Sequence, residues 1–210
     1  MMLEFYTNPQ SRGTTVRWML EEVGCPYEVV PLAYGPAMKA ADYLAINPMG
    51  KVPAIVHEGP AGRQVVTECA AICAWLADAF PGAGLAPPPA ERGSYYRWLF
   101  FAAGPVEATM MNGHLGVRLS PEQQAMAGYG SREAVVAALR EAVPRGDGWI
   151  AGAAFSAADV YAGGMVDWGL AFGMLPEEPD FLAYRDRLTS RPAFQRAHAL
   201  DLELQAAMEG

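Results

Sequence analysis

Residues 50–80 read GKVPAIVHEGPAGRQVVTECAAICAWLADAF, and this stretch establishes the architecture of the first part of the chain. Two β-prone runs, Val52–Val56 and Gln64–Thr67, are separated by the turn-rich segment His57–Arg63. A helix is expected next, over Glu68–Phe80, because apolar residues recur there every four positions. The pattern therefore predicts two strands joined by a turn and followed by a helix.

Short β-prone and helical segments alternate upstream of this stretch. Leu3–Thr7 and Tyr27–Leu32 are typical of strands. Val16–Gly24 and Met38–Ala45 are typical of helices, the first with Gly24 as its stop signal. The resulting order, β-α-β-α-β-β-α, resembles a thioredoxin fold, whose second half is a ββα unit. We therefore expect an α/β thioredoxin-like N-terminal domain over residues 1–80.

The composition changes after residue 80. Residues 81–89 read PGAGLAPPP, which is typical of a linker, and we place the linker at residues 81–90. The segments beyond it are all predicted to be helical: Glu91–Val117, Pro121–Tyr129, Ser131–Val143, Ser156–Phe172, Pro179–Ser190 and Pro192–Met208. The first should bend at Gly104-Pro105, because proline lacks an N–H and clashes with the preceding turn. We therefore expect an all-α C-terminal helical domain over residues 91–210.

The charge balance excludes one class of partner. The 210 residues hold 15 Lys and Arg against 23 Asp and Glu, a formal net charge of −8. A phosphate backbone requires clustered basic residues, so no nucleic-acid partner is expected. No apolar run approaches the roughly 18 residues of a membrane span, and the first residues lack a signal-peptide pattern. We expect no membrane association and a cytoplasmic location.

Cysteines and histidines are few and scattered. The three cysteines form no CxxC pair, which favours a reducing compartment over a disulfide scaffold or zinc site. The three histidines form no HExxH motif or His/Cys cluster, so no metal is expected. These residues are Cys25, Cys69, Cys73, His57, His114 and His198.

The turn Thr7–Gly13 joins the first predicted strand to the first predicted helix. A helix start presents unpaired backbone N–H groups and a partial positive charge, so it stabilises an anion placed there. Ser11 could donate a hydrogen bond to such an anion, or it could simply cap the helix. The residues of the turn leave both interpretations open.

Pro53 opens a predicted strand, which is unusual and can mark a cis peptide bond. A cis bond would leave the backbone N–H and C=O of Val52 available to pair with a peptide-like ligand. The alternative is an ordinary trans proline at a sheet edge, with Lys51 as a solvated surface residue.

Thr67-Glu68-Cys69 leads into another helix start, suited to a ligand carboxylate. Glu68 could hold an ammonium group, or it could merely complement the helix dipole. Cys69 could have a lowered pKa there, although apolar packing with Cys73 one turn later is the simpler interpretation.

Ser156 and Asp159 are spaced as a capping-box variant, in which the Asp159 carboxylate accepts from the backbone N–H of the N-cap residue. We interpret both as structural and expect Asp159→Ala to cost about 0.5–2 kcal/mol, as for a lost cap.

Four segments together resemble bacterial and fungal glutathione transferases. They are Tyr6–Gly24, Asn47–Ala54, Thr67–Ile72 and the capping motif Phe155–Asp159. The likeness runs from Leu3 to about Phe194, and the four motifs occur in family order and spacing. The resemblance implies a glutathione S-transferase fold, a homodimer, and a glutathione site on the thioredoxin-like domain.

The resemblance also implies which residues contact glutathione. Val52, before the cis-proline Pro53, would pair with the cysteinyl backbone, and Glu68-Cys69 would bind the γ-glutamyl group. Many family members have Ser where Cys69 stands, so its side-chain hydrogen bond would be weaker. Beyond the resemblance, we expect Lys51 and Arg12 to meet the carboxylates of glutathione, and Asn8 and Arg12 could donate to its sulfur.

The resemblance implies a catalytic Tyr, Ser or Cys in the first turn. Cysteine is absent there, which disfavours the thiol-transferase branch, and Tyr6 lies within the strand. We therefore expect Ser11 to stabilise the glutathione thiolate. The thiolate would attack a small, largely apolar electrophile against the helical domain. The candidate lining residues are Tyr95, Trp98, Phe101 and Met110.

Three functions remain open at this point. The first is conjugation of glutathione to electrophiles. The second uses the same site for isomerisation, reductive dehalogenation or peroxide reduction. The third is a non-catalytic protein of this fold that binds ligands or protein partners.

Overall fold

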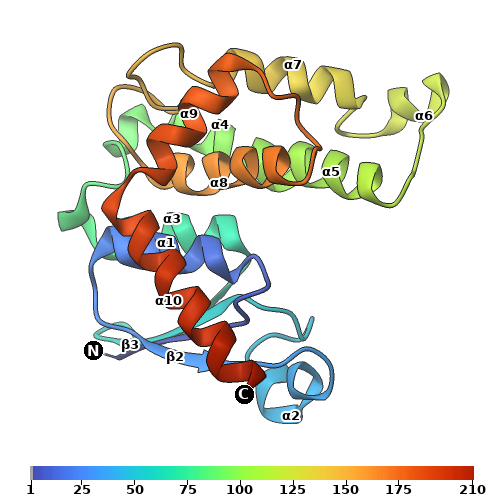
Figure 1. Cartoon of the computed structure of the whole chain (residues 1–210). Coiled ribbons are helices and arrows are strands. Elements are labelled where there is room, and N and C mark those ends of the chain that lie inside the picture. Colours follow the sequence, from blue (N-terminus) through green and yellow to red (C-terminus); the bar gives the residue numbers. More distant parts are fainter. Residues whose placement is uncertain (1) are drawn as a thin grey trace. The chain divides into compact units, whose positions relative to one another are not determined.

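The structure, a computed structural model, describes residues 2–210 and divides into two compact units. The first unit holds residues 2–85 together with residues 190–210, and the second holds residues 86–189 (Figure 1). The division after residue 85 falls inside the predicted linker, residues 81–90.

The first unit is built on a mixed four-stranded sheet in the order β2-β1-β3-β4. Its strands are β1 (Met2–Thr7), β2 (Glu28–Pro31), β3 (Ala54–Gly59) and β4 (Gly62–Thr67). Strand β1 runs parallel to β2 and antiparallel to β3, and β3 and β4 form an antiparallel hairpin. This is the thioredoxin-like sheet that the sequence predicts.

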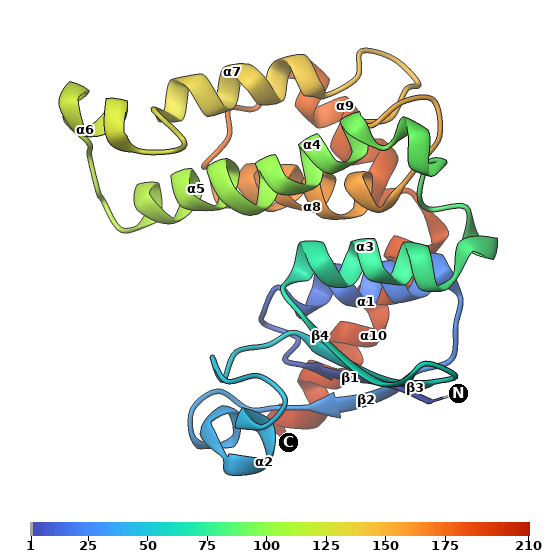
Figure 2. The same cartoon turned by 180° about the vertical axis from the view of Figure 1, so that it is seen from behind.

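Two helices cover one face of this sheet. Helices α1 (Gly13–Val23) and α3 (Cys69–Ala79) pack against each other on it (Figure 2). Side chains alternate along β1, so that Leu3 and Phe5 are buried on the side of these helices. Gly24 ends α1 as predicted, because it adopts a left-handed conformation, with φ of 70°, that glycine adopts at little cost.

The segment predicted as a helix over Met38–Ala45 is divided in the structure. A 3-10 helix spans Pro36–Lys39, and α2 spans Ala41–Leu44. The extended backbone of Ala40, with ψ of 146°, separates the two. The predicted single helix is therefore wrong.

The last helix, α10 (Pro192–Glu209), belongs to the sheet unit and packs along α1 (Figure 1). Arg17 on α1 and Asp201 on α10 form a buried ion pair of 2.6 Å, and Trp18 meets Phe194 edge-on. This differs from the predicted helical domain over residues 91–210, because the C-terminal part of that range packs with the first unit.

The second unit is entirely helical. Its helices are α4 (Gly93–Phe101), α5 (Glu107–His114), α6 (Pro121–Met126), α7 (Arg132–Ala142), α8 (Ala157–Ala171) and α9 (Pro179–Thr189). At Gly104-Pro105, where the sequence predicts a bend, a π-helical segment over Ala102–Val106 links α4 to α5. The wider turn makes room for the proline ring and its missing N–H.

Asp159 of α8 is fully buried within this helical unit. Its carboxylate accepts hydrogen bonds from the backbone N–H groups of Ile150 and Ser156 and from the hydroxyls of Ser156 and Tyr184, at 2.7–3.1 Å. Burial raises the pKa of Asp159, although the four donors oppose this shift. Asp159 is therefore more than a cap, since it also fixes the Ile150 loop and α9.

We predict that Asp159→Ala lowers the free energy of unfolding by about 3–5 kcal/mol, because it leaves several buried donors without an acceptor. Ser156→Ala, which removes the capping hydroxyl alone, should cost only about 0.5–2 kcal/mol. Urea unfolding followed by circular dichroism measures both. If the two variants lose the same stability, Asp159 acts as a helix cap alone.

Candidate functional site

Three segments meet at one end of the sheet because of strand register. Tyr6 of β1 lies opposite Ala54 of β3, and Ala54 lies opposite Thr67 of β4. The turn that follows β1, the Val52-Pro53 peptide that precedes β3, and Glu68 after β4 therefore all leave the sheet at the same end. These are the three segments that the sequence singles out for glutathione.

Ser11 lies at the start of α1, but its hydroxyl faces its own turn. Ser11 Oγ donates to the C=O of Asn8 at 2.7 Å and accepts from the N–H of Gly13 at 3.0 Å. The side chain is half-buried. In this arrangement the hydroxyl caps the turn. To donate to a ligand, it would have to rotate and give up its hydrogen bond to the Asn8 carbonyl.

Thr7 contributes a second hydroxyl that the sequence reasoning missed. It is fully buried, and its Oγ1 has no hydrogen-bond partner among residues 2–210. A Cβ added to Gly13 would overlap this oxygen, so only glycine lets α1 begin so close to the strand. The signal that could have found Thr7 is the alternation of β1, which places it on the same face as Leu3 and Phe5.

Asn8 and Arg12 occupy different environments. Asn8 is buried, donates its amide to the C=O of Leu32 at 2.8 Å, and accepts from the N–H of Gln10 at 2.9 Å. It therefore ties the turn to the end of β2. Arg12 is exposed at the N-terminus of α1, and its C=O accepts from the thiol of Cys69 at 3.5 Å. This contact holds the starts of α1 and α3 together.

The Val52-Pro53 peptide bond is cis, so the alternative of an ordinary trans proline does not apply. The preceding carbonyl, that of Lys51, accepts from the hydroxyl of Tyr43 and from the amide of Asn47. Within residues 2–210, neither the N–H nor the C=O of Val52 takes part in a hydrogen bond. Pro53 is buried, whereas the Lys51 side chain is exposed.

The Tyr6 hydroxyl is engaged with a neighbour on its own strand. The Tyr6 ring packs against Tyr43, and the hydroxyl donates to Glu4 at 2.8 Å. Burial and the neighbouring carboxylate raise the pKa of Tyr6 to about 12. Its phenol therefore stays protonated and engaged with Glu4.

Glu68 has a strained backbone at the start of α3. With φ of 68°, it is the sole non-glycine residue with positive φ among those described. Its side chain is exposed while its C=O accepts from the N–H of Ile72 at 2.9 Å. Strain of this kind gathers at functional sites, where the fold over-determines an unfavourable conformation.

The two cysteines of α3 are packing residues. Cys69 and Cys73 are both buried, and burial raises the pKa of the Cys73 thiol well above its ordinary value. Cys73 is therefore kept as a neutral thiol.

The four residues predicted to line an electrophile site are found in different environments. Tyr95 and Trp98 are 1% and 6% exposed and belong to the core of the helical unit. This corrects their predicted placement, because α4 turns these two positions inward. Phe101 is half-buried against Trp98, and Met110 lines a cavity within the same unit.

Two kinds of feature are absent from the described part of the chain. Residues 2–210 contain no group of three or more His, Cys, Asp or Glu side chains placed to hold a metal ion. No helix in the same residues is long and apolar enough to cross a membrane.

Comparisons with known proteins find similarity to one family. The model of the glutathione S-transferase N-terminal domain matches residues 12–79, which span α1 through α3. The disulfide-bond oxidoreductase YfcG of Escherichia coli K12 is 26% identical over 203 residues, 93% of this chain and 94% of that protein. The chain thus carries a domain of the glutathione S-transferase N-terminal type and is similar to proteins of this family over nearly its whole length.

Solved structures of this family have the same fold over nearly the whole chain. The glutathione transferase of Methylococcus capsulatus is 28% identical with a TM-score of 0.73, covering 95% of this chain and 98% of that one. A sphingomonad glutathione S-transferase, solved in complex with glutathione, is 28% identical with a TM-score of 0.71, covering 94% and 98%.

We predict that Glu68→Gly leaves the free energy of unfolding unchanged or raises it by up to about 2 kcal/mol. Glycine relieves about 1–3 kcal/mol of backbone strain. It also loses more conformational entropy on folding, which reduces the gain in stability by about 0.5–1 kcal/mol. Glu68→Ala keeps the strain and is the matched control. Thermal and urea unfolding measure both variants, and a Glu68→Gly protein less stable than Glu68→Ala would contradict the assignment of strain.

Proposed function

We propose that the chain is a glutathione transferase that conjugates the glutathione thiolate to small, largely apolar electrophiles. One observation carries the proposal: the turn at Ser11, the unpaired backbone of Val52 and the strained Glu68 lie at the same end of one sheet. The family relationship supports glutathione as the ligand of this group.

The contacts follow from the chemistry of each segment. The N–H and C=O of Val52 can accept one added peptide strand, because both are unpaired and the cis bond fixes their direction. The Glu68 carboxylate would pair with the ammonium of the γ-glutamyl group, and the Cys69 N–H at the start of α3 would meet its carboxylate. The exposed cations Lys51 and Arg12 would meet the other carboxylate of the tripeptide.

The thiol would lie against the start of α1. A free thiol with a pKa near 8.5 is mostly protonated at neutral pH, and the thiolate is the nucleophile. Lowering that pKa by two units requires only about 2.7 kcal/mol, which one hydrogen bond to the anion and the helix-end field can supply. We propose Ser11 as that donor, its hydroxyl turning from the Asn8 carbonyl to the sulfur.

The reaction then balances simply. The thiol proton leaves to solvent, and the sulfur lone pair forms a bond to the electrophilic carbon. The leaving group departs with its bonding electrons, or a conjugated acceptor takes up the pair and a proton. The protein supplies position and anion stabilisation, and its own groups form no covalent bond.

A second candidate function is glutathione-dependent reduction of disulfides. It is favoured by the full-length relative YfcG, whose name is disulfide-bond oxidoreductase. Since the first turn holds no cysteine, two glutathione molecules would supply the electrons. The disulfide would be reduced to two thiols while the two glutathiones are oxidised to one glutathione disulfide.

We also propose a homodimer and a cytoplasmic setting. Similarity to the family supports the first, and three cysteines that remain free thiols are compatible with the second.

Retention on glutathione-agarose tests the proposed ligand, followed by assays with a generic aryl halide and with hydroxyethyl disulfide. The transferase proposal predicts retention and conjugation, whereas the second candidate predicts retention and disulfide reduction alone. Glu68→Gly, which is expected to keep its fold, should lose retention. A protein that is neither retained nor stabilised against heat by glutathione would eliminate both functions.

Ser11→Ala should raise the pKa of bound glutathione by about 1–2 units, because one hydrogen bond to the charged sulfur is lost. Titration of thiolate absorbance in the binary complex measures this shift. Thr14→Ala is the matched control, since Thr14 is an exposed hydroxyl in the same helical turn that donates to the Ser11 carbonyl. An unaltered titration in Ser11→Ala, with a raised pKa in Thr7→Val, would transfer the role to Thr7.

A further inference from the structure

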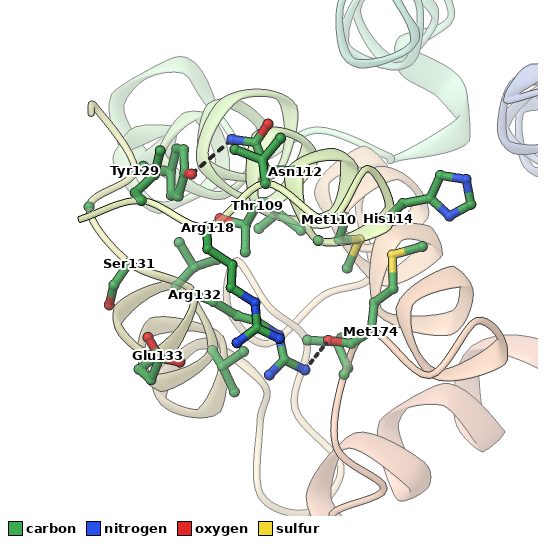
Figure 3. Close-up of a pocket in the computed structure, with 18 of the residues that line it drawn as sticks. Thr109, Met110, Asn112, His114, Arg118, Tyr129, Ser131, Arg132, Glu133 and Met174 are labelled. Atoms are coloured by element: carbon green, nitrogen blue, oxygen red, sulfur yellow. Dashed lines mark hydrogen bonds between the residues drawn. The ribbon is translucent and has the colours of Figure 1, made fainter. Parts of the chain in front are cut away.

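The helical unit contains a cavity of its own, of about 650 Å³. Residues of α5, α7, the loop between α5 and α6, and the loop after α8 line it (Figure 3). All of them lie between positions 106 and 175, within the second unit. The cavity thus shares no residue with the group at Ser11, Val52 and Glu68. Its volume is within the range of small-molecule sites.

Much of the lining is apolar. Aliphatic side chains from three elements contribute to it, namely Val106, Met110, Val135, Val136, Leu139 and Leu175. All six are at most 5% exposed, so they are part of the folded core and do not depend on a ligand for their position. An apolar molecule can therefore bury surface here without reorganising the unit.

Two arginines bring positive charge into this apolar space. Arg118 comes from the loop after α5 and Arg132 from the first position of α7, and Figure 3 shows both pointing toward the same part of the cavity. Arg132 donates to the carbonyl of Met174 at 2.9 Å. The guanidinium of Arg118 has no hydrogen bond or ion pair within the described residues.

The start of α7 adds to this positive field. Ser131 caps the helix through the N–H of Ala134, and both Ser131 and Arg132 line the cavity. An eleven-residue helix has a partial positive charge at its N-terminus. Glu133 is the sole carboxylate of the lining, against Arg118 and Arg132.

A buried hydroxyl independently indicates a ligand. Thr109 is 7% exposed and lines the cavity, yet its Oγ1 has no hydrogen-bond partner in residues 2–210. A buried hydroxyl without a partner has lost its hydrogen bonds to water without replacement, so native proteins rarely contain one. By contrast, the nearby amide of Asn112 is engaged, since it donates to the hydroxyl of Tyr129 at 2.8 Å.

We propose that this cavity binds a small organic anion with an apolar body, such as a medium-chain carboxylate. Arg118 and Arg132 hold the anionic head, together with the N-terminus of α7, while the aliphatic lining holds the tail. Thr109 donates to, or accepts from, a polar atom of the bound molecule. The site is additional to the proposed glutathione site and does not depend on it.

Methyl NMR of the full chain labelled at methionine tests the location, with decanoate as the probe. Met110 and Met174 line the cavity, and Met38 in the core of the sheet unit serves as the internal control. We expect saturable shifts of the Met110 and Met174 methyls and none at Met38. Shifts absent from Met110 and Met174 at saturating decanoate would overturn the proposal.

Variants test the chemistry. Arg118→Gln should weaken decanoate binding about tenfold or more and leave decanol binding unchanged, because only the carboxylate uses the guanidinium. Thr109→Val should weaken decanoate severalfold while keeping the volume. Arg145→Gln removes an equally charged but 83% exposed arginine of the same unit, outside the cavity, and should bind as the parent does.

Two results would contradict the anion site. One is equal weakening by Arg118→Gln and Arg145→Gln, which would indicate general electrostatics. The other is equal loss of decanol and decanoate, which would indicate a damaged cavity. Glutathione-agarose retention of Arg118→Gln is measured in parallel and should be unchanged, so failure of this proposal is distinguishable from failure of the proposed function.

Discussion

Strand β1 is hydrogen-bonded along both of its edges, and this double pairing positions the rest of the sheet unit. It runs parallel to β2 on one side and antiparallel to β3 on the other. The register of these pairs places three points of the chain at the same end of the sheet. They are the exit from β1 toward α1, the entry into β3 and the exit from β4. The alternation of β1 then divides its side chains between two environments: Thr7 faces Gly13 of α1, and Tyr6 faces Tyr43. The candidate site is thus a consequence of strand pairing.

The Arg17–Asp201 pair is a buried contact between α10 and α1 of the sheet unit. Both side chains are at most 7% exposed, so removing either would leave an uncompensated buried charge. Burial raises the pKa of Asp201, and the guanidinium of Arg17 acts against that shift. Such a pair adds little net stability over apolar residues of equal size. It acts together with a second ion pair between α1 and the start of α10, Arg191–Glu22 at 2.6 Å.

Sequence reasoning worked where a structural feature depends on neighbours in the chain. The stop at Gly24, the interruption at Pro105 and the contact between Ser156 and Asp159 are local signals, and each corresponds to a feature of the structure. Sequence reasoning failed where a feature depends on how distant segments pack against each other. Tyr95 and Trp98 are spaced as a helix face, but the sequence does not say which neighbours cover that face, and here they are core. The partner of α10 is set by contacts between residues far apart in the chain, such as the ion pair between Arg17 and Asp201, 184 positions apart.

The candidate glutathione site shows the same division. The residue types could be chosen from the sequence, because helix starts and a proline before a strand are local patterns. The sequence does not show, however, in which direction each polar side chain points. Ser11 donates back to Asn8 because that carbonyl lies within its own turn, and Thr7 Oγ1 is buried beside Gly13 without a hydrogen-bond partner.

The chain has a net charge of −8, but the electrostatic potential near particular helix starts and cations differs from that average in both units. Anionic ligands are repelled by the chain as a whole, but this repulsion is screened beyond about 8–10 Å at physiological salt. Within that distance, helix starts and a few cations set the potential: Lys51 and Arg12 in one unit, Arg118 and Arg132 in the other. An acidic protein can therefore hold anions at chosen points while repelling the polyanions that bind basic surfaces without selectivity. The excess of carboxylates is compatible with anionic ligands, and it restricts binding to sites where dipoles and cations converge.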